Sequence, residues 1–140
     1  MDPLSIVVGS GGLLSLAIQV AQILKKYTSR VASAPELATE VACETFGIIT
    51  IFRQLQTLLI NGPQLSESDS TDLKDVLEGC VQTFSQLHVE IACFEEFGDG
   101  RRLELVDRLK WSFKESTISR ILKILSSQKL TLSILLNLHT

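Results

Sequence analysis

Apolar residues recur every three or four positions along most of the chain, which is the spacing of one face of an α-helix. The clearest series alternates steps of four and three residues through Leu73, Leu77, Cys80, Phe84, Leu87, Ile91 and Phe94. No segment alternates apolar and polar residues convincingly at the period of two that a half-buried strand shows. The sequence therefore predicts one all-α domain over residues 1–140, a helical bundle of four to five helices with a long apolar N-terminal helix and a long C-terminal helix.

The first predicted helix, over residues 4–30, has two unlike halves. From Leu13 onward its apolar stripe lies opposite a polar stripe formed by Ser15, Gln19, Gln22, Lys26 and Ser29. The first half contains Gly9, Gly11 and Gly12, and each glycine costs about 1 kcal/mol relative to alanine inside a helix. We expect these glycines to permit close approach of another helix, a hinge or a switch from strand to loop, with a loosely packed, irregular N-terminus as the alternative.

The same helix has no charged residue between Asp2 and Lys25. An uncharged helix of about 22 residues is about 33 Å long, which is close to the thickness of the hydrocarbon core of a bilayer. The pattern fits the buried central helix of a soluble bundle equally well. We expect the helix to be folded against the others from Leu13 onward, because a span that always faced lipid would not need the polar stripe.

Capping and breaking residues mark the ends of the next two helices. Ser33 and Glu36 have the spacing of the N-cap and N3 residues of a capping box, so the second helix is predicted to start at Ser33. Its end is predicted at Asn61, because Gly62 and Pro63 follow. The third helix is predicted over residues 68–97, before the break at residues 98–100.

Two more helices are predicted in the last third of the chain, a short one over residues 101–110 and a final one over residues 114–138. The apolar face of the final helix is formed by Ile118, Leu122, Leu125, Leu132 and Leu136, and is widened by Ile121, Ile124 and Leu135. Lys129 interrupts this face. We expect its ammonium group to extend outward to solvent along the aliphatic part of its own side chain.

Charge is segregated along the chain, although the net charge is only −3. Residues 1–35 carry +2, residues 36–100 carry −10 and residues 101–140 carry +5. Such segregation indicates either acidic and basic helices lying side by side in one fold or a basic surface that meets anionic lipid or nucleic acid. Because the pI is near 5.4 and only one segment is strongly basic, we expect no nucleic-acid binding.

Residues with catalytic or metal-binding chemistry are few. Cys43, Cys80 and Cys93 lie within apolar helical patterns and are predicted to be buried, reduced thiols of an intracellular protein. His88 falls one position off the apolar series of the third helix and is predicted to lie at the surface or at its boundary. There is no phosphate-binding glycine loop, nucleophile elbow or cysteine pair with metal-ligand spacing, so we expect neither an enzyme nor a bound cofactor or metal.

Several stretches of the chain resemble one protein family. They are residues 1–5 (MDPLS), 12–17 (GLLSLA) and 109–115 (LKWSFKE), and the closing pattern of Leu125, Lys129, Leu130 and Leu132 also fits. The family is the fungal N-terminal domain of STAND proteins, the HeLo-like group, and the resemblance extends from residue 1 to about residue 138. The family often has proline where this chain has Ser112, and the substitution loosens the turn expected before the final helix.

The resemblance implies an α-helical effector domain at the N-terminus of a fungal NOD-like receptor, whose nucleotide-binding region would follow in the same protein. HeLo-like domains are similar to membrane-targeting cell-death domains, including the fungal heterokaryon-incompatibility domain. The resemblance implies that the first helix leaves the bundle on oligomerisation and enters a membrane, so that a cytoplasmic protein relocates to the plasma membrane. The alternative is a soluble module that oligomerises or docks another protein through the third helix, without membrane activity.

These expectations define groups of candidate residues. The membrane-insertion candidates are Leu4, Ile6, Val7, Val8, Leu13, Leu14, Leu16, Ile18, Val20, Ile23 and Leu24. The candidates for contact with lipid headgroups are Lys25, Lys26 and Arg30, those for self-packing are Gly9, Gly11 and Gly12, and Trp111 and Phe113 form an expected structural motif. The expected partners are other copies of the chain, anionic membrane lipids and the nucleotide-binding region in cis.

Overall fold

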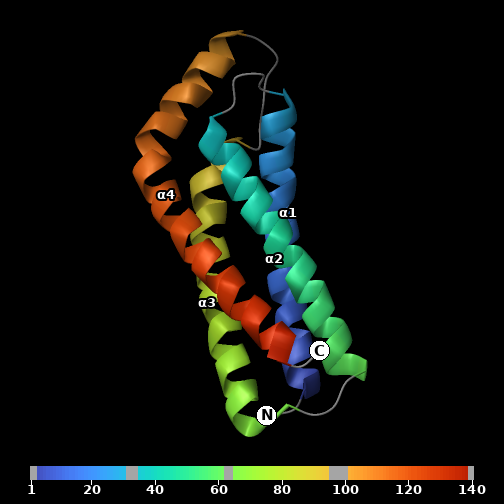
Figure 1. Ribbon diagram of the computed structural model, residues 1–140. Helices are drawn as coiled ribbons and strands as arrows, with labels where there is room; N and C mark the ends of the chain where they lie inside the picture. The colour runs from blue at the N-terminus through green and yellow to red at the C-terminus, as the bar shows by residue number, and fades with distance from the viewer. Residues whose placement is uncertain (1–2, 31–34, 62–64, 95–100, 139–140) are drawn as a thin grey trace.

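In the part of the chain that it describes, the computed structural model contains four α-helices and one 3-10 turn (Figure 1). They are α1 (Pro3–Arg30), α2 (Glu36–Asn61), α3 (Glu67–Ile91), η1 (Ala92–Phe94) and α4 (Arg101–Leu138). The structure describes the backbone of residues 3–30, 35–61, 65–94 and 101–138, and the side chains of residues 12–29, 35–61, 65–94 and 109–138. No strand occurs in these ranges, so the predicted all-α bundle is confirmed.

The four helices run alternately up and down, with α1 rising from the end marked N in Figure 1. α1 packs against both α2 and α3, and α4 packs against the same two helices. In the view of Figure 1, α4 crosses in front of α3. α1 and α4 therefore lie diagonally across the bundle.

The core is built from the apolar stripes that the sequence predicts. Every member of the series on the third predicted helix, from Leu73 to Phe94, is buried. The largest side chains with no more than 1% exposure include Tyr27, Phe52, Phe84 and Phe94. Full burial of a side chain of this kind stabilises the fold by about 1.5–3 kcal/mol relative to its exposure.

Two buried threonines show how polar groups are accommodated in this core. The Thr45 hydroxyl donates to the carbonyl of Val41 at 2.8 Å, and the Thr83 hydroxyl donates to the carbonyl of Gly79 at 2.9 Å. Each hydroxyl bonds to the carbonyl four residues earlier in its own helix. Burial therefore leaves neither hydroxyl without an acceptor.

α2 ends at Asn61 as predicted, but its start and the boundaries of α3 differ from those predicted. α2 begins at Glu36, where the Pro35 carbonyl accepts a bond from the Ala38 N–H at 3.0 Å, so Glu36 occupies the first helical position instead of N3. The predicted cap, Ser33, lies outside the described residues. At the start of α3 the Ser66 hydroxyl caps the N–H of Asp69 at 3.1 Å. The α-helix ends at Ile91 and tightens into η1, so the prediction of one helix to residue 97 was wrong in this part.

The prediction of two helices in the last third of the chain was also wrong. α4 is a single helix of 38 residues. None of its residues is glycine or proline, and at position 112 a serine can donate its backbone N–H to the helix, which proline cannot. Trp111 and Phe113 therefore lie within a continuous helix instead of a turn.

Candidate functional site

The buried face of α1 consists almost entirely of hydrocarbon. Leu13, Ala17, Val20, Ala21, Ile23, Leu24 and Tyr27 are buried, and Leu14, Leu16 and Ile18 are half-buried against the core. Of these side chains only Tyr27 carries a polar atom. The side chains of the insertion candidates Leu4, Ile6, Val7 and Val8 lie outside the described residues, although their backbone belongs to α1. Seven of the eleven insertion candidates are thus packed, wholly or partly, against α2 and α3.

The opposite face of α1 is polar and open to solvent, as predicted. Ser15, Gln19 and Gln22 are exposed. Gly12 is also exposed, and a Cβ atom built on it would meet no other atom within 4 Å. Gly12 is therefore not used for packing within this bundle, and the surroundings of Gly9 and Gly11 lie outside the described residues.

The cationic end of α1 lies at the end of the bundle opposite the chain's N-terminus (Figure 1). Lys25 and Lys26 are exposed, and the side chain of Arg30 lies outside the described residues. The hydroxyls of Thr28 and Ser29 both donate to the carbonyl of Lys25, at 3.1 and 2.7 Å. Both hydroxyls are thus satisfied by the backbone of α1 itself.

A cluster of three buried rings joins α1, η1 and α4. The ring of Tyr27 lies 5.1 Å from that of Phe94 and 5.7 Å from that of Trp111, centroid to centroid. Phe94 and Trp111 are stacked at 5.0 Å with 19° between their planes. Phe113 is 85% exposed, so the expected structural motif divides into a core residue and a surface residue.

Polar bonds between helices connect α4 to its two neighbours. The Lys129 ammonium lies 2.8 and 2.9 Å from the two carboxylate oxygens of Glu44 on α2, so the expectation that it extends to solvent was wrong. Lys114 pairs with Glu90 on α3 at 3.1 Å. The amide of Gln128 donates to the hydroxyl of Thr83 at 3.0 Å.

An acidic groove runs between the first half of α2 and the middle of α4. Two adjoining hollows, of about 560 and 500 Å³, share Glu36 and Glu40 in their walls. Glu115 of α4 lines the first hollow, and the ion pair of Glu44 with Lys129 lines the second. Sequence reasoning missed this groove because its carboxylates come from helices that are distant in the chain.

The cysteines depart from their predicted burial. Cys80 is buried, and burial raises the pKa of its thiol to about 12. Cys43 and Cys93 are exposed free thiols, because each lies off the buried stripe of its segment. His88 is half-buried, at the predicted boundary. Within the described residues no group of three or more histidine, cysteine or acidic side chains is arranged to hold a metal ion.

One continuous side of α4 points away from the bundle along about eight helical turns. We call it the outer face of α4, and it consists of Leu109, Phe113, Ser116, Arg120, Lys123, Ile124, Ser127, Leu130, Thr131, Ile134 and Leu138, all of which are exposed. Its apolar side chains are between 38 and 85% exposed. The expected burial of Ile124 was wrong, since it belongs to this face.

Among the described residues, Leu109–Leu138 of α4 is also the segment that is long and apolar enough to span a membrane by length and composition. Core helices of soluble proteins meet the same criterion. Sequence reasoning looked for such a segment only in the first helix. The sequence also contained an indication of such a segment in α4, because no acidic residue follows Glu115 in the chain.

Comparison with known proteins yields a family assignment. No curated protein and no solved structure matches the chain. One family profile, described as "Pigment biosynthesis cluster protein PigL N-terminal", matches residues 1–140, which is the whole sequence. The chain belongs to this PigL N-terminal family.

Proposed function

We propose that this domain is a HeLo-like, membrane-targeting cell-death effector whose α1 leaves the bundle and enters a membrane when several copies assemble. In this proposal the domain is not an enzyme, rests in the cytoplasm and relocates to the plasma membrane on activation. A nucleotide-binding region of the same protein would control its assembly. The observation that carries the proposal is the apolar character of the buried face of α1.

Apolar contacts are the kind that a bilayer can replace. The leucine, valine, isoleucine and alanine side chains of α1 lose little when acyl chains take the place of α2 and α3, because lipid is as apolar as the protein core. The polar bonds made by Lys129, Lys114 and Gln128 instead join α4 to α2 and α3. Departure of α1 would leave these bonds intact, so the other three helices can stay together.

The length and the flanking charges of α1 are compatible with a transmembrane orientation. The uncharged stretch from Pro3 to Leu24 is followed by Lys25 and Lys26, where the headgroups of the bilayer would lie. Each such cation near an anionic surface contributes about 1 kcal/mol. Ser15, Gln19 and Gln22 would face other copies or a water-filled path, which is why entry is proposed for an assembly and not for a single chain.

The alternative of a soluble self-association module depended on the apolar series of α3. That series is buried between α1 and α4 in this structure. It is therefore unavailable to another chain unless the bundle opens. The geometry favours the membrane proposal for this reason.

A fluorescent probe at Gly12 tests the proposal with little disturbance of the fold, because the site is open. The variant Gly12→Cys is made with Cys43→Ser and Cys93→Ser, labelled with an environment-sensitive dye, and fused to an inducible dimerisation domain. Residue 12 lies near the middle of the uncharged stretch. When the protein is clustered in the presence of vesicles that contain anionic lipid, we expect the surroundings of the dye to become apolar. We also expect nitroxides placed deep in the acyl chains to quench its fluorescence.

The matched control is the same dye at Lys74→Cys, an exposed position of α3. It should remain in water throughout, and leakage of vesicle contents should accompany the change at residue 12. If clustered protein released the contents while the dye at residue 12 stayed in water, the role proposed for α1 would be rejected.

A further inference from the structure

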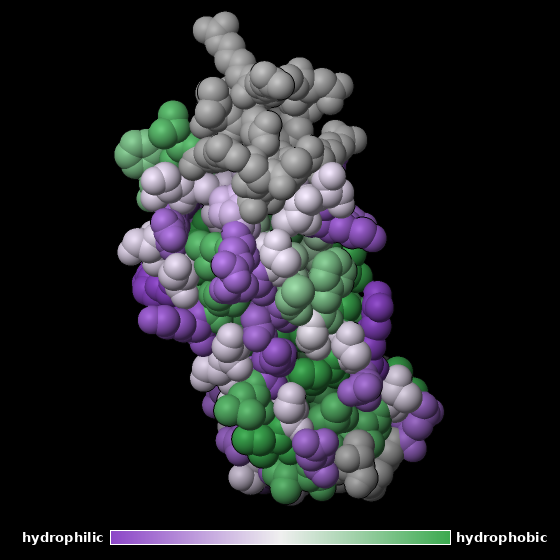
Figure 2. Space-filling view, turned by 45° about the horizontal axis from the view of Figure 1, so that its top comes forward, coloured by the Kyte–Doolittle hydropathy of each residue, from purple (hydrophilic) through white to green (hydrophobic). Residues whose placement is uncertain are grey.

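The outer face of α4 combines features that are separate elsewhere on the molecule. Phe113, Leu130, Ile134 and Leu138 are each at least half exposed. Arg120 and Lys123 lie among them, exposed to solvent and without an ion-pair partner in the described part of the chain. Figure 2 shows hydrophobic side chains gathered at the end of the molecule toward which α4 descends in Figure 1.

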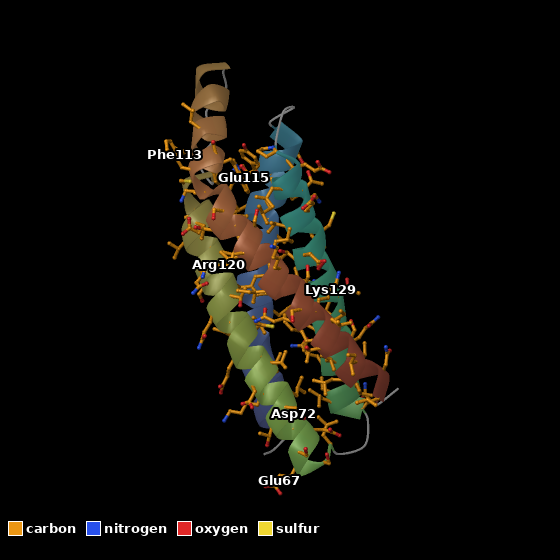
Figure 3. The ribbon with its side chains drawn as sticks, turned by 60° about the vertical axis from the view of Figure 1, so that its left-hand side comes forward. Glu67, Asp72, Phe113, Glu115, Arg120 and Lys129 are labelled. Atoms are coloured by element: carbon orange, nitrogen blue, oxygen red, sulfur yellow. The ribbon has the colours of Figure 1, made fainter. Side chains whose placement is uncertain are left out.

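No acidic group lies on this face, and Glu115, the acidic residue in the described side chains of α4, lies on another side of the helix. Glu115 points toward α2, where it borders the acidic groove together with Glu36 and Glu40. Figure 3 shows Phe113 and Glu115 on different sides of α4. From residue 116 to the end of the chain there are three basic residues and no acidic one. The cations of the outer face therefore have no carboxylate beside them on that face.

We propose that the outer face of α4 is a docking surface for anionic lipid, on which the folded domain lies with α4 parallel to the membrane plane. Amphipathic surfaces of this kind place apolar side chains at the boundary of headgroups and acyl chains, while cations bind the headgroups. The inference rests on the proposed function, since it names the surface through which the same domain first meets a membrane. It differs from the entry of α1, because docking needs no change in the bundle.

α4 lies on the membrane and does not cross it, although its length would permit a span. Its inner side carries Lys114, Gln128 and Lys129, which are bonded to Glu90, Thr83 and Glu44. Crossing would break all these bonds and place the separated groups in hydrocarbon. Docking through the outer face leaves every one of them in place.

Charge also indicates that the outer face of α4 binds a lipid surface and not a second copy of the chain. Two outer faces packed together would bring Arg120 and Lys123 close to their counterparts, with no carboxylate on the face to neutralise them. An anionic bilayer supplies the missing negative charge. The attraction should therefore weaken with salt, because these cations are exposed.

Vesicle co-sedimentation of the full 140-residue chain tests the proposal in two arms. The apolar arm is the double variant Leu130→Ser with Ile134→Ser, and the charge arm is Arg120→Gln with Lys123→Gln. We expect binding to phosphatidylcholine vesicles that contain phosphatidylserine to fall at least tenfold in the apolar arm and about thirtyfold in the charge arm. Only the wild type and the apolar arm should lose further affinity when salt is raised.

Matched controls come from exposed positions on other helices. Ile60→Ser with Val89→Ser removes comparable exposed apolar groups from α2 and α3, and Arg53→Gln with Lys74→Gln removes two exposed cations. Both controls should bind vesicles as the wild type does. Circular dichroism should show the same helix content for all variants, because every changed side chain is exposed.

The outcomes separate this inference from the proposed function. If both outer-face variants bound vesicles as tightly as the wild type, the docking surface would be rejected, while the dye at residue 12 would still report on α1. If these variants instead changed the oligomeric state in sedimentation velocity and left lipid binding alone, the face would be an interface between copies. Docking without any response at residue 12 after clustering would support the surface and reject α1 entry.

Discussion

Truncation of Trp111 is the most direct test of how α1 is held to the rest of the bundle. Trp111 is 2% exposed, and its ring contacts those of Tyr27 and Phe94. Replacing a buried tryptophan with alanine costs about 3–5 kcal/mol through lost burial and the cavity left behind. The energy of the two ring contacts is included in that range, because each aromatic pair contributes about 0.5–1.5 kcal/mol beyond the burial of its apolar area.

The variant Trp111→Phe distinguishes the contribution of the stacked ring to stability from that of the indole nitrogen. Phenylalanine can keep the stack on Phe94, and it removes an indole N–H that is buried without an acceptor among the described residues. The loss of volume is partly offset by removal of that unsatisfied donor, so we expect a cost of only about 1 kcal/mol. Phe113→Ala, at an 85% exposed position two residues away, should change stability by less than about 0.5 kcal/mol.

The assay is urea unfolding followed by far-ultraviolet circular dichroism, because Trp111 is the only tryptophan and its fluorescence disappears with it. With a denaturant slope of about 2 kcal/mol per molar, Trp111→Ala should lower the midpoint by about 1.5–2.5 M. A midpoint for Trp111→Ala within about 0.3 M of the wild type would refute the reasoning. So would an effect of Phe113→Ala as large as that of Trp111→Ala.

Four further predictions concern individual side chains. Lys129→Met should cost about 1 kcal/mol in thermal unfolding, because it leaves the half-buried carboxylate of Glu44 without its cation; an unchanged melting temperature would contradict this. Maleimide at pH 8 should modify the two exposed cysteines of the folded protein and reach Cys80 only in denaturant, as mass spectrometry would show. The raised pKa of Cys80 also implies that stability falls as the pH rises above about 9, where the thiol of the unfolded chain ionises and that of the folded chain does not. Ser66→Ala should cost about 1 kcal/mol and Ser66→Asp much less, and equal stability of the two variants would exclude a capping role.

Periodicity was sufficient to predict the buried faces of α1 and α3. The apolar series of α3 could be read without ambiguity because polar residues separate its members, and all of it is buried. The polar face of α1 was equally clear from Ser15, Gln19 and Gln22. In both helices the two faces differ strongly in polarity, so the sequence alone shows which one is buried.

The same approach failed for α4, for an identifiable reason. Beyond Ile118 this helix carries leucine or isoleucine on nearly every side, so periodicity cannot tell Ile121, which is buried, from Ile124, which is exposed. The choice depends on where α2 and α3 lie, and the sequence does not reveal that. The ion pair of Lys129 with Glu44 was missed for the same reason, since it joins residues 85 positions apart.

The diagonal placement of α1 and α4 has a consequence for the order of the two membrane steps proposed above. A domain that rests on its α4 outer face holds α1 diagonally across the bundle, so that the axis of α1 lies about 1.4 interhelical spacings, or roughly 11–14 Å, beyond that of α4. In the proposed mechanism, attachment alone would then leave the bilayer intact, because the helix proposed to enter it is the one held farthest from it. On these proposals, the attached domain would stay inactive at the membrane, and the step that activates it would be the separation of α1 from α2 and α3.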